Sequence, residues 1–224
     1  MSKRSIRAAV PAQPLTLGMA QSTPPYEIIT DTIEVHRHRV YISDDLDEPA
    51  EYIELIDLLR SAAAHDTFTI YLNTAGGQVD TGLQLINAIR DSAAEVTMVL
   101  DTRAYSMGAF MFLAGDIQVV PDHAQLMLHH YSGGLLGKGN EQLAEVKATS
   151  RNFEKLFRSI CLPFLTPDEI THIMNGQDLW LDAEEIRRRL KRCAREAEQG
   201  LAAAAEKPKR RRRLAAPAVE EAQG

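Results

Sequence analysis

The chain has 224 residues, 45% hydrophobic and 25% charged, which is ordinary for one soluble globular domain with tails. Its net charge of -6 gives no whole-protein reason to expect nucleic-acid binding, and its two cysteines, Cys161 and Cys193, argue against a disulfide framework or a structural zinc site. The same cysteine usage makes a reducing cytoplasm the expected compartment. No apolar run approaches the roughly 18 residues of a membrane span, so no membrane contact is expected.

Both ends of the chain differ in composition from its middle. Residues 1–25 are rich in Pro, Ala, Gln, Ser and Thr without periodicity, which predicts a flexible N-terminal arm. Residues 196–224 form a low-complexity tail with a basic run at 209–213, which is more often solvated than bound to nucleic acid. A helix entering this tail would extend as far as Glu206, because Pro208 would stop it. The folded domain is therefore expected over residues 26–195.

Strands and helices alternate along this domain. Strands are expected from β-branched and aromatic content at 39–42, 68–72, 95–101, 117–120 and 124–130. Helices are expected from apolar periodicity and cap-like residues at 48–64, 78–92, after Ser106, at 140–160, from 166–169 and from 182–185. This alternation predicts an α/β fold with parallel strands and right-handed crossovers.

The stretch "AYSMGAFMFLAG" (104–115) places the hydroxyl of Ser106 at a small-residue turn before an apolar helix. Serine is a preferred N-cap residue, so a helix cap is one interpretation. The other is a nucleophile on a strand-to-helix turn, held at the positive end of the helix dipole. The local sequence alone does not decide between the two.

The stretch "NTAGGQV" (73–79) also joins a strand to a helix. Its two glycines permit positive φ and let backbone N–H groups point outward, where they can bind an anion or a developing oxyanion. The spacing fits neither a dinucleotide fingerprint nor a P-loop. Adjacent α/β units place their C-terminal turns side by side, so Gly77 and the Ser106 turn could face one pocket, with the N–H of Met107 as second donor. An ordinary tight turn is the alternative.

A nucleophilic serine needs a base, and His129 and His130 end a strand shortly after the Ser106 helix. Strand alternation sends neighbours to opposite faces, so only one of them can face the pocket. A pair of partly exposed strand-end histidines is the alternative interpretation. Asp178 in "NGQDLWL" is a candidate for the carboxylate that orients the histidine, although spacing does not distinguish it from a surface acid.

Residues from about 39 to 185 resemble the ClpP family, the self-compartmentalised serine peptidases of the ClpP/crotonase fold. Four blocks carry the resemblance: "YLNTAGGQVDTG", "AYSMGAFMFLAG", "LMLHHYSGG" and "DLWLDAEE". The resemblance implies an α/β fold of repeated β-β-α units with a protruding handle helix, which residues 140–160 would form. It implies a serine endopeptidase that hydrolyses peptide bonds inside an oligomeric ring chamber.

The resemblance assigns roles position by position. Ser106 matches the nucleophile, His129 the base and Asp178 the orienting acid. Gly77 and Met107 match the oxyanion donors. A bound peptide would add as a strand beside Ser132, Gly133, Gly134 and Leu135.

The resemblance also implies partners: a second copy in stacked heptameric rings, a polypeptide substrate and an AAA+ unfoldase. No metal or organic cofactor is expected, and ATP would be used only by the unfoldase. The chain departs from the family pattern at Tyr105, which replaces a small residue and is expected to narrow the pocket. It departs again after "DAEE", where a basic helix replaces the family's glycine turn and final strand. The docking surface for an unfoldase is in question there.

Other functions stay open beside this one. The compact, tailed chain also resembles bacteriophage relatives, some of which process capsid proteins during head maturation. A non-catalytic ring subunit would lack a catalytic residue, whereas all three candidates are present. A crotonase-type acyl-CoA enzyme would need no serine and histidine in these blocks. A binding module would use the Arg-rich tail on nucleic acid or a capsid, which could coexist with peptidase activity.

Overall fold

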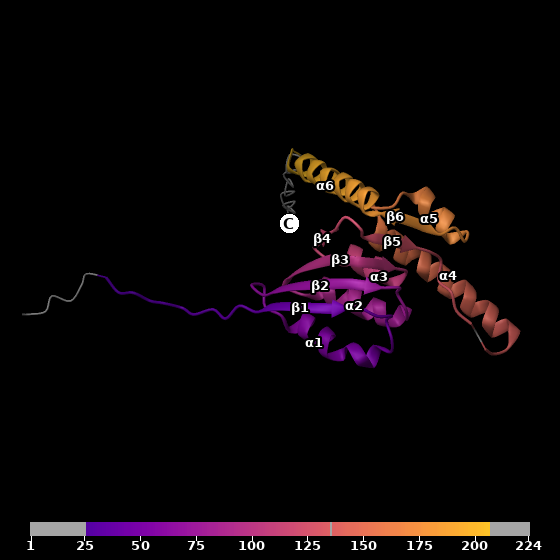
Figure 1. Ribbon diagram of the computed structural model, residues 1–224, viewed down its shortest axis with the longest axis horizontal. Coiled ribbons are helices and arrows are strands. Elements are labelled where there is room, and N and C mark those ends of the chain that lie inside the picture. The colour runs from indigo at the N-terminus through magenta and orange to yellow at the C-terminus, as the bar shows by residue number, and fades with distance from the viewer. Residues whose placement is uncertain (1–25, 135, 207–224) are drawn as a thin grey trace, which may run out of the picture. The chain divides into compact units, whose positions relative to one another are not determined.

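The computed structural model describes residues 26–134 and 136–206 of the chain (Figure 1). The chain divides into two units, Met1–Glu34 and Val35–Gly224. The described part of the first unit, residues 26–34, contains neither helix nor strand. The N-terminal arm expected at 1–25 and the basic run at 209–213 lie outside the described residues.

The second unit is built on a six-stranded sheet. Its strands are β1 (Arg37–Ile42), β2 (Thr67–Thr74), β3 (Glu95–Tyr105), β4 (Ile117–Val119), β5 (Gln125–Leu128) and β6 (Leu179–Asp182). They follow the order β1-β2-β3-β5-β6, with β4 paired to β3. The pairings from β1 to β5 are parallel, as the alternation of elements predicts. The strands from β1 to β5 therefore form the parallel part of an α/β fold, as expected.

The last strand corrects the expectation of a wholly parallel sheet. β6 pairs with β5 in the antiparallel direction, and the sequence did not indicate a strand there. Four residues are too few for the alternation of a strand to be distinguished from the start of a helix. This short strand brings Asp178 back to the sheet, beside the end of β5.

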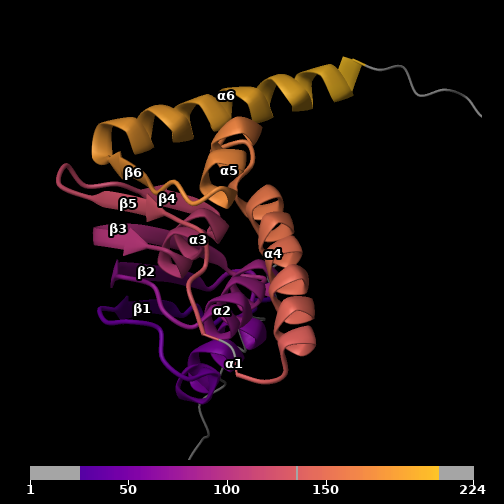
Figure 2. The same cartoon turned by 90° about the vertical axis from the view of Figure 1, so that its right-hand side faces the viewer.

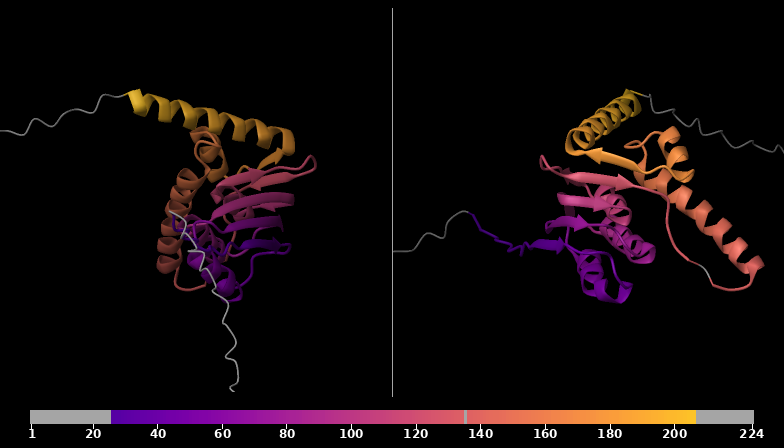
Figure 3. Two further views of the ribbon diagram at one scale, coloured as in Figure 1. Left: turned by 90° about the vertical axis from the view of Figure 1, so that its left-hand side faces the viewer. Right: turned by 45° about the vertical axis from the view of Figure 1, so that its right-hand side comes forward.

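Seven helical segments connect the strands. They are the 3-10 helix η1 (Pro49–Tyr52) and the α-helices α1 (Ile53–Ser61), α2 (Val79–Asp91), α3 (Met107–Ala114), α4 (Gly139–Cys161), α5 (Pro167–Met174) and α6 (Ala183–Glu206). Figures 2 and 3 show α2, α3 and α4 together on one side of the sheet. Alternate residues of β2 (Phe68, Ile70 and Leu72) are buried, whereas those between them are half-buried. This period-two pattern marks the face against the core.

Helix α3 is apolar on every side because it lies in the core. All residues from Met107 to Phe112 are buried, and the aromatic ring of Phe110 packs against those of Phe153 and Phe157 from α4. A helix without a polar face is stable only where other elements surround it. The apolar run that follows Ser106 thus fixes the start of α3 deep in the domain, which in turn fixes the Ser106 turn.

Two later helices follow their sequence signals. In "TPDE", the Thr166 hydroxyl accepts the N–H of Glu169 while the Glu169 carboxylate accepts the N–H of Thr166, which confirms a capping box at the start of α5. Helix α6 continues from the domain to Glu206, two residues before Pro208. It thus runs across the boundary expected at 195. None of the described helices has both the length and the apolar composition needed to cross a bilayer.

Candidate active site

Ser106 lies in a strained turn between β3 and α3. With a φ of 52° and a ψ of -122°, it is the one non-glycine residue with positive φ among the described residues. Such a conformation costs on the order of 1–3 kcal/mol and persists only where the surroundings impose it. The Ser106 side chain makes no capping hydrogen bond to α3, although it occupies the N-cap position. The cap interpretation therefore does not explain the hydroxyl, which sits at the positive end of the helix dipole.

The backbone of Ser106 is tied to the neighbouring strand. Its N–H donates to the carbonyl of Met127 at 2.9 Å, and Tyr105 pairs with Met127 in the β3–β5 register. His129 follows Met127 by two residues. The parallel pairing of β3 with β5 thus brings the serine block and the histidine block to the same edge of the sheet.

The glycine turn lies directly against the Ser106 turn. Gly76 has a φ of 99°, and a Cβ added there would lie 2.7 Å from the Cβ of Ser106 and 3.1 Å from the amide nitrogen of Met107. Gly77 has a φ of 140°, and a Cβ there would lie 2.3 Å from the carbonyl oxygen of Leu46. Only glycine fits either position without displacing backbone.

Two other groups hold the glycine turn in place. The buried hydroxyl of Thr74 accepts the N–H of Gly76 at 3.0 Å. From the other side, the N–H of Leu46 donates to the Gly76 carbonyl at 2.6 Å, and the Gln78 N–H donates to the Leu46 carbonyl at 2.8 Å. Backbone donors held this firmly do not have to reorganise when charge develops beside them.

One cavity of about 310 Å³ unites several of the residues singled out from the sequence. Ser106, His129, Gly77 and Ser132 all line it. Met107 does not line it, but its amide nitrogen lies against the glycine turn as the first residue of α3. The cavity therefore combines a hydroxyl, an imidazole and rigid backbone turns within one small volume.

His130 lies outside that cavity. Its Nδ1 is 3.1 Å from the Tyr131 carbonyl oxygen, and its ring packs on those of Tyr131 and Phe153. With Ser132 and the two glycines that follow, it lines a neighbouring cavity of about 620 Å³ next to α4. Alternation at the end of β5 has thus separated the two histidines. Leu135, the last residue of the expected peptide-binding strand, lies outside the described residues.

Asp178 is related to His129 through the sheet and not through the cavity. The β5–β6 register ends with Leu128 opposite Leu179, and His129 and Asp178 are the next residues beyond this pair. Continued by one step, an antiparallel register would set them opposite each other, where Cβ atoms lie about 4.5–5.5 Å apart. Asp178 is exposed and does not line the 310 Å³ cavity. Ser106 and His129 thus follow β3 and β5, and Asp178 immediately precedes the antiparallel β6, so each residue of the expected triad adjoins one of three neighbouring strands.

The side chain of Tyr105 corrects an expectation. Its hydroxyl donates to Oε1 of Gln125, and its ring packs edge-on against Trp180 with centroids 5.2 Å apart. Tyr105 does not line the Ser106 cavity, so the expected narrowing of the pocket is wrong. The physical reason is that successive residues of a strand point to opposite faces.

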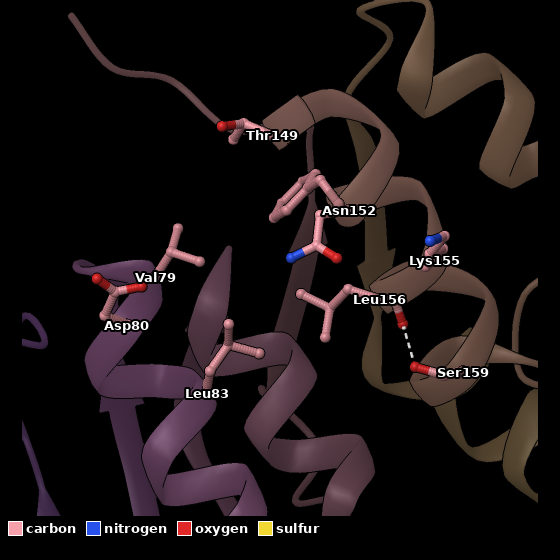
Figure 4. Close-up of a pocket in the computed structure, with 9 residues that line it drawn as sticks. Val79, Asp80, Leu83, Thr149, Asn152, Lys155, Leu156 and Ser159 are labelled. Carbon is pink, nitrogen blue, oxygen red and sulfur yellow. Dashed lines mark hydrogen bonds between the residues drawn. The ribbon is translucent and has the colours of Figure 1, made fainter. Parts of the chain in front are cut away.

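A second cavity, of about 430 Å³, adjoins the first. Figure 4 shows Val79 and Leu83 of α2 pointing toward Asn152 and Leu156 of α4 across it. Val79 lines both cavities, as does Phe153, so the two spaces are adjacent. A group extending from the Ser106 cavity would enter a mixed apolar and polar space between the two helices.

Sequence reasoning missed three contributors to the site: Gly76, Thr74 and the segment around Leu46. The sequence comparison points to Gly77 as the oxyanion donor, whereas Gly76 is the glycine that packs against Ser106. Leu46 follows β1, and the carboxyl ends of parallel strands share one edge of the sheet, so its position was a usable signal.

The sequence model of the Clp protease family matches residues 29–189. The chain is similar to curated proteins named ATP-dependent Clp protease proteolytic subunit. It is 28% identical over 122 residues to that of Chlorella vulgaris and 29% identical over 123 residues to that of Oltmannsiellopsis viridis. Each match covers 52% of this chain and 61% or 63% of the relative, so the chain spans about three fifths of their length. Since the family model covers most of the chain, the protein belongs to the Clp protease family.

Proposed function

We propose that the chain is a serine endopeptidase in which Ser106, His129 and Asp178 form a catalytic triad. The observation that carries the proposal is the shared cavity of Ser106 and His129, with a strained serine whose hydroxyl caps no helix. Membership of the Clp protease family supports peptidase chemistry. The register of β5 and β6 supports Asp178 as the carboxylate opposite the histidine.

The proposed reaction follows from these positions. His129 accepts the proton of Ser106 as the hydroxyl oxygen attacks the carbonyl carbon of the scissile peptide bond. The N–H groups of Gly77 and Met107 donate to the resulting oxyanion. As the C–N bond breaks, His129 returns the proton to the departing amine, and an acyl-enzyme remains on Ser106. His129 then deprotonates a water molecule, which hydrolyses the ester and restores the serine.

The substrate in this proposal is an extended polypeptide. Residues 132–134 are exposed and belong to no strand, so their backbone groups are available to pair with a peptide by β-augmentation. The adjacent cavity between Leu83 and Leu156 would accept a side chain next to the scissile bond. No metal or organic cofactor takes part in the proposed reaction.

The proposed assembly is a homo-oligomer of stacked heptameric rings in the cytoplasm, with the active sites enclosed. Helix α4 would be the handle, and its exposed Leu143 and Val146 are apolar residues that an assembly would cover. The relatives' names carry the words ATP-dependent, and in this proposal ATP is used by a partner AAA+ unfoldase. Processing of capsid proteins in a phage head would use the same chemistry with a different substrate.

Hydrolysis of a quenched fluorescent peptide library tests the reaction. We expect turnover by the native chain and none by Ser106→Ala. Ser61→Ala is the matched control, because Ser61 is an exposed hydroxyl on α1 that bonds only to the backbone of its own helix. Equal turnover by Ser106→Ala and the native chain would refute the proposed nucleophile.

A further inference from the structure

Two segments of opposite charge stand out on the second unit. Residues 44–57 carry seven carboxylates and no lysine or arginine, and residues 187–195 carry six basic side chains and no carboxylate. The whole chain has a net charge of -6, so the basic segment contrasts with the rest of the molecule. Asp45 lines the Ser106 cavity and the Leu46 backbone holds the glycine turn, but no charged side chain of either segment takes part in the proposed reaction.

The acidic segment forms an exposed face on η1 and α1. Its exposed carboxylates are those of Asp44, Asp45, Asp47, Glu48, Glu51, Glu54 and Asp57. Among them lie two exposed apolar side chains, Ile53 at 62% and Leu58 at 37% of full exposure. Apolar side chains surrounded by a charged rim are characteristic of a surface that another protein covers.

The basic segment on α6 divides into two sets, and the first set holds the helix to its own domain. Arg187 bonds to the Val120 carbonyl and to Asp122. Arg189 is buried and pairs with Glu169 of α5 as well as with Glu185 of its own helix. Arg192 donates to the carbonyls of Pro163 and Phe164. These contacts fix the orientation of α6 and so decide which of its side chains point outward.

The second set is Arg188, Lys191 and Arg195, which face solvent. Their spacing of three and then four residues puts them on one face of the helix. The Arg188 side chain is 74% exposed and shares its one carboxylate partner, Glu185, with Arg189. Beside this face, Arg188 and Arg195 line a cavity of about 350 Å³. We call Arg188, Lys191 and Arg195 the basic face.

The two charged faces lie at opposite edges of the sheet. η1 and α1 connect the edge strand β1 to β2, whereas α6 follows the other edge strand, β6. Figures 1 and 2 both show α1 and α6 far apart on opposite sides of the strands. A contact between them therefore needs two molecules, and it joins unlike surfaces. Such a head-to-tail contact repeats from copy to copy and builds a ring or a filament.

We propose that the basic face of α6 docks on the acidic face of η1 and α1 in a second copy of this chain. Charge complementarity would select the partner and its register, while Ile53 and Leu58 would be buried at the centre of the contact. A polyanion such as nucleic acid is the less favoured occupant, because the chain as a whole is acidic and Glu196 adjoins the basic face. The inference rests on the oligomeric assembly within the proposed function but not on the triad.

A charge-swap experiment tests this contact. The variants R188E/K191E/R195E and E51K/E54K/D57K are made in the Ser106→Ala chain, so that assembly is measured apart from activity. By sedimentation velocity, we expect each variant alone to assemble at least about ten-fold more weakly than the Ser106→Ala parent. A chain that carries both triple substitutions should restore assembly, because its new acidic α6 meets the new basic α1 of the next copy at every contact of the ring. R188K/R195K keeps every charge and is the matched control.

Three results would overturn the proposal: a parent chain that stays monomeric, triple variants that assemble like the parent, or a combined variant that assembles no better than either triple variant alone. Loss of nucleic-acid binding in R188E/K191E/R195E with unchanged assembly would assign the basic face to a polyanion instead. If a triple variant unfolds at the assay temperature, the single pair R195E and E54K replaces it. An assembly that responds as expected but hydrolyses no peptide with Ser106 restored would refute the proposed reaction and leave this contact standing.

Discussion

The N–H of Ser106 donates a 2.9 Å hydrogen bond to the carbonyl of Met127, and this bond joins two blocks that are distant in the sequence. Because His129 follows two residues later, the bond fixes the serine turn relative to the end of β5. On the other side of β5, the register with β6 ends at Leu128 and Leu179, which adjoin His129 and Asp178 in the chain. The candidate site is thus held by backbone pairing within the sheet.

The two adjacent histidines should differ completely in function. His129→Ala should reduce kcat by about 10²–10⁴-fold, the usual contribution of a general base. His130→Gln should leave kcat within a few-fold of the native value, because His130 lines another cavity and packs on Phe153. Steady-state hydrolysis of one peptide by both variants makes the comparison. A larger loss in His130→Gln than in His129→Ala would reverse the assignment of the base.

The close approach of Gly76 to Ser106 predicts a severe effect of one methyl group. In Gly76→Ala the new Cβ would lie 2.7 Å from the Cβ of Ser106 with φ at 99°, so the turn must shift. We expect the free energy of unfolding to fall by about 2–4 kcal/mol and peptide hydrolysis to be lost. Gly139→Ala is the control, because a Cβ there meets nothing within 4 Å and Gly139 lies outside the proposed peptide-binding segment. Chemical denaturation and peptide hydrolysis measure the two effects, and equal behaviour of the two variants would contradict the geometry.

Asp178→Asn should lower kcat with little change in KM. Its carboxylate would orient His129 and stabilise the imidazolium form, which matters in the transition state more than in substrate binding. Loss of the acid from such a triad lowers kcat by up to about 10⁴-fold. Asp182→Asn, at the far end of β6, is the matched control, since Asp182 accepts the N–H of Glu185 and asparagine caps helices equally well. If both variants keep native kcat, Asp178 is a surface acid.

The ion pair of Glu169 with Arg189 should make the free energy of unfolding decrease at low pH. Hydrogen bonds from Arg189 lower the pKa of Glu169 from 4.5 to about 2, so the ionised carboxylate stabilises the folded state. This stabilisation is fully present above pH 4.5 and is lost as the pH falls toward 2. It amounts to roughly 2–3 kcal/mol. Glu169→Gln should remove that part of the pH dependence of the free energy of unfolding. Asp168→Asn, which changes the exposed neighbouring carboxylate, should keep this pH dependence. If the free energy of unfolding varies with pH in the same way in both variants, the pH dependence does not come from Glu169.

Most elements could be predicted from the sequence because their signals are local. Alternation of buried residues marks β2, and the TPDE box starts α5 where it was expected. The four-residue β6 could not be predicted, because its identity as a strand depends on pairing with β5 across a long separation in sequence. Pairing direction is likewise a property of the whole chain and not of four residues.

The candidate site divides in the same way. The glycine turn and the Ser106 turn are local motifs that the sequence shows. That the Ser106 side chain makes no capping hydrogen bond is known only from the structure, in which its φ and ψ are unusual. The place of Tyr105 before the serine does not reveal the face to which it points, because that face depends on the alternation along β3. The contribution of Leu46 required knowledge of which strand ends share an edge of the sheet.

Reaction of the purified chain with a fluorophosphonate, followed by intact mass, tests the central claim most directly, because such reagents label only an activated serine. The account predicts one adduct per chain on the native protein, and none on Ser106→Ala at the same concentration and folded state. An adduct that persists in Ser106→Ala, or a folded and assembled native chain that forms none, would contradict the claim that Ser106 is a nucleophile.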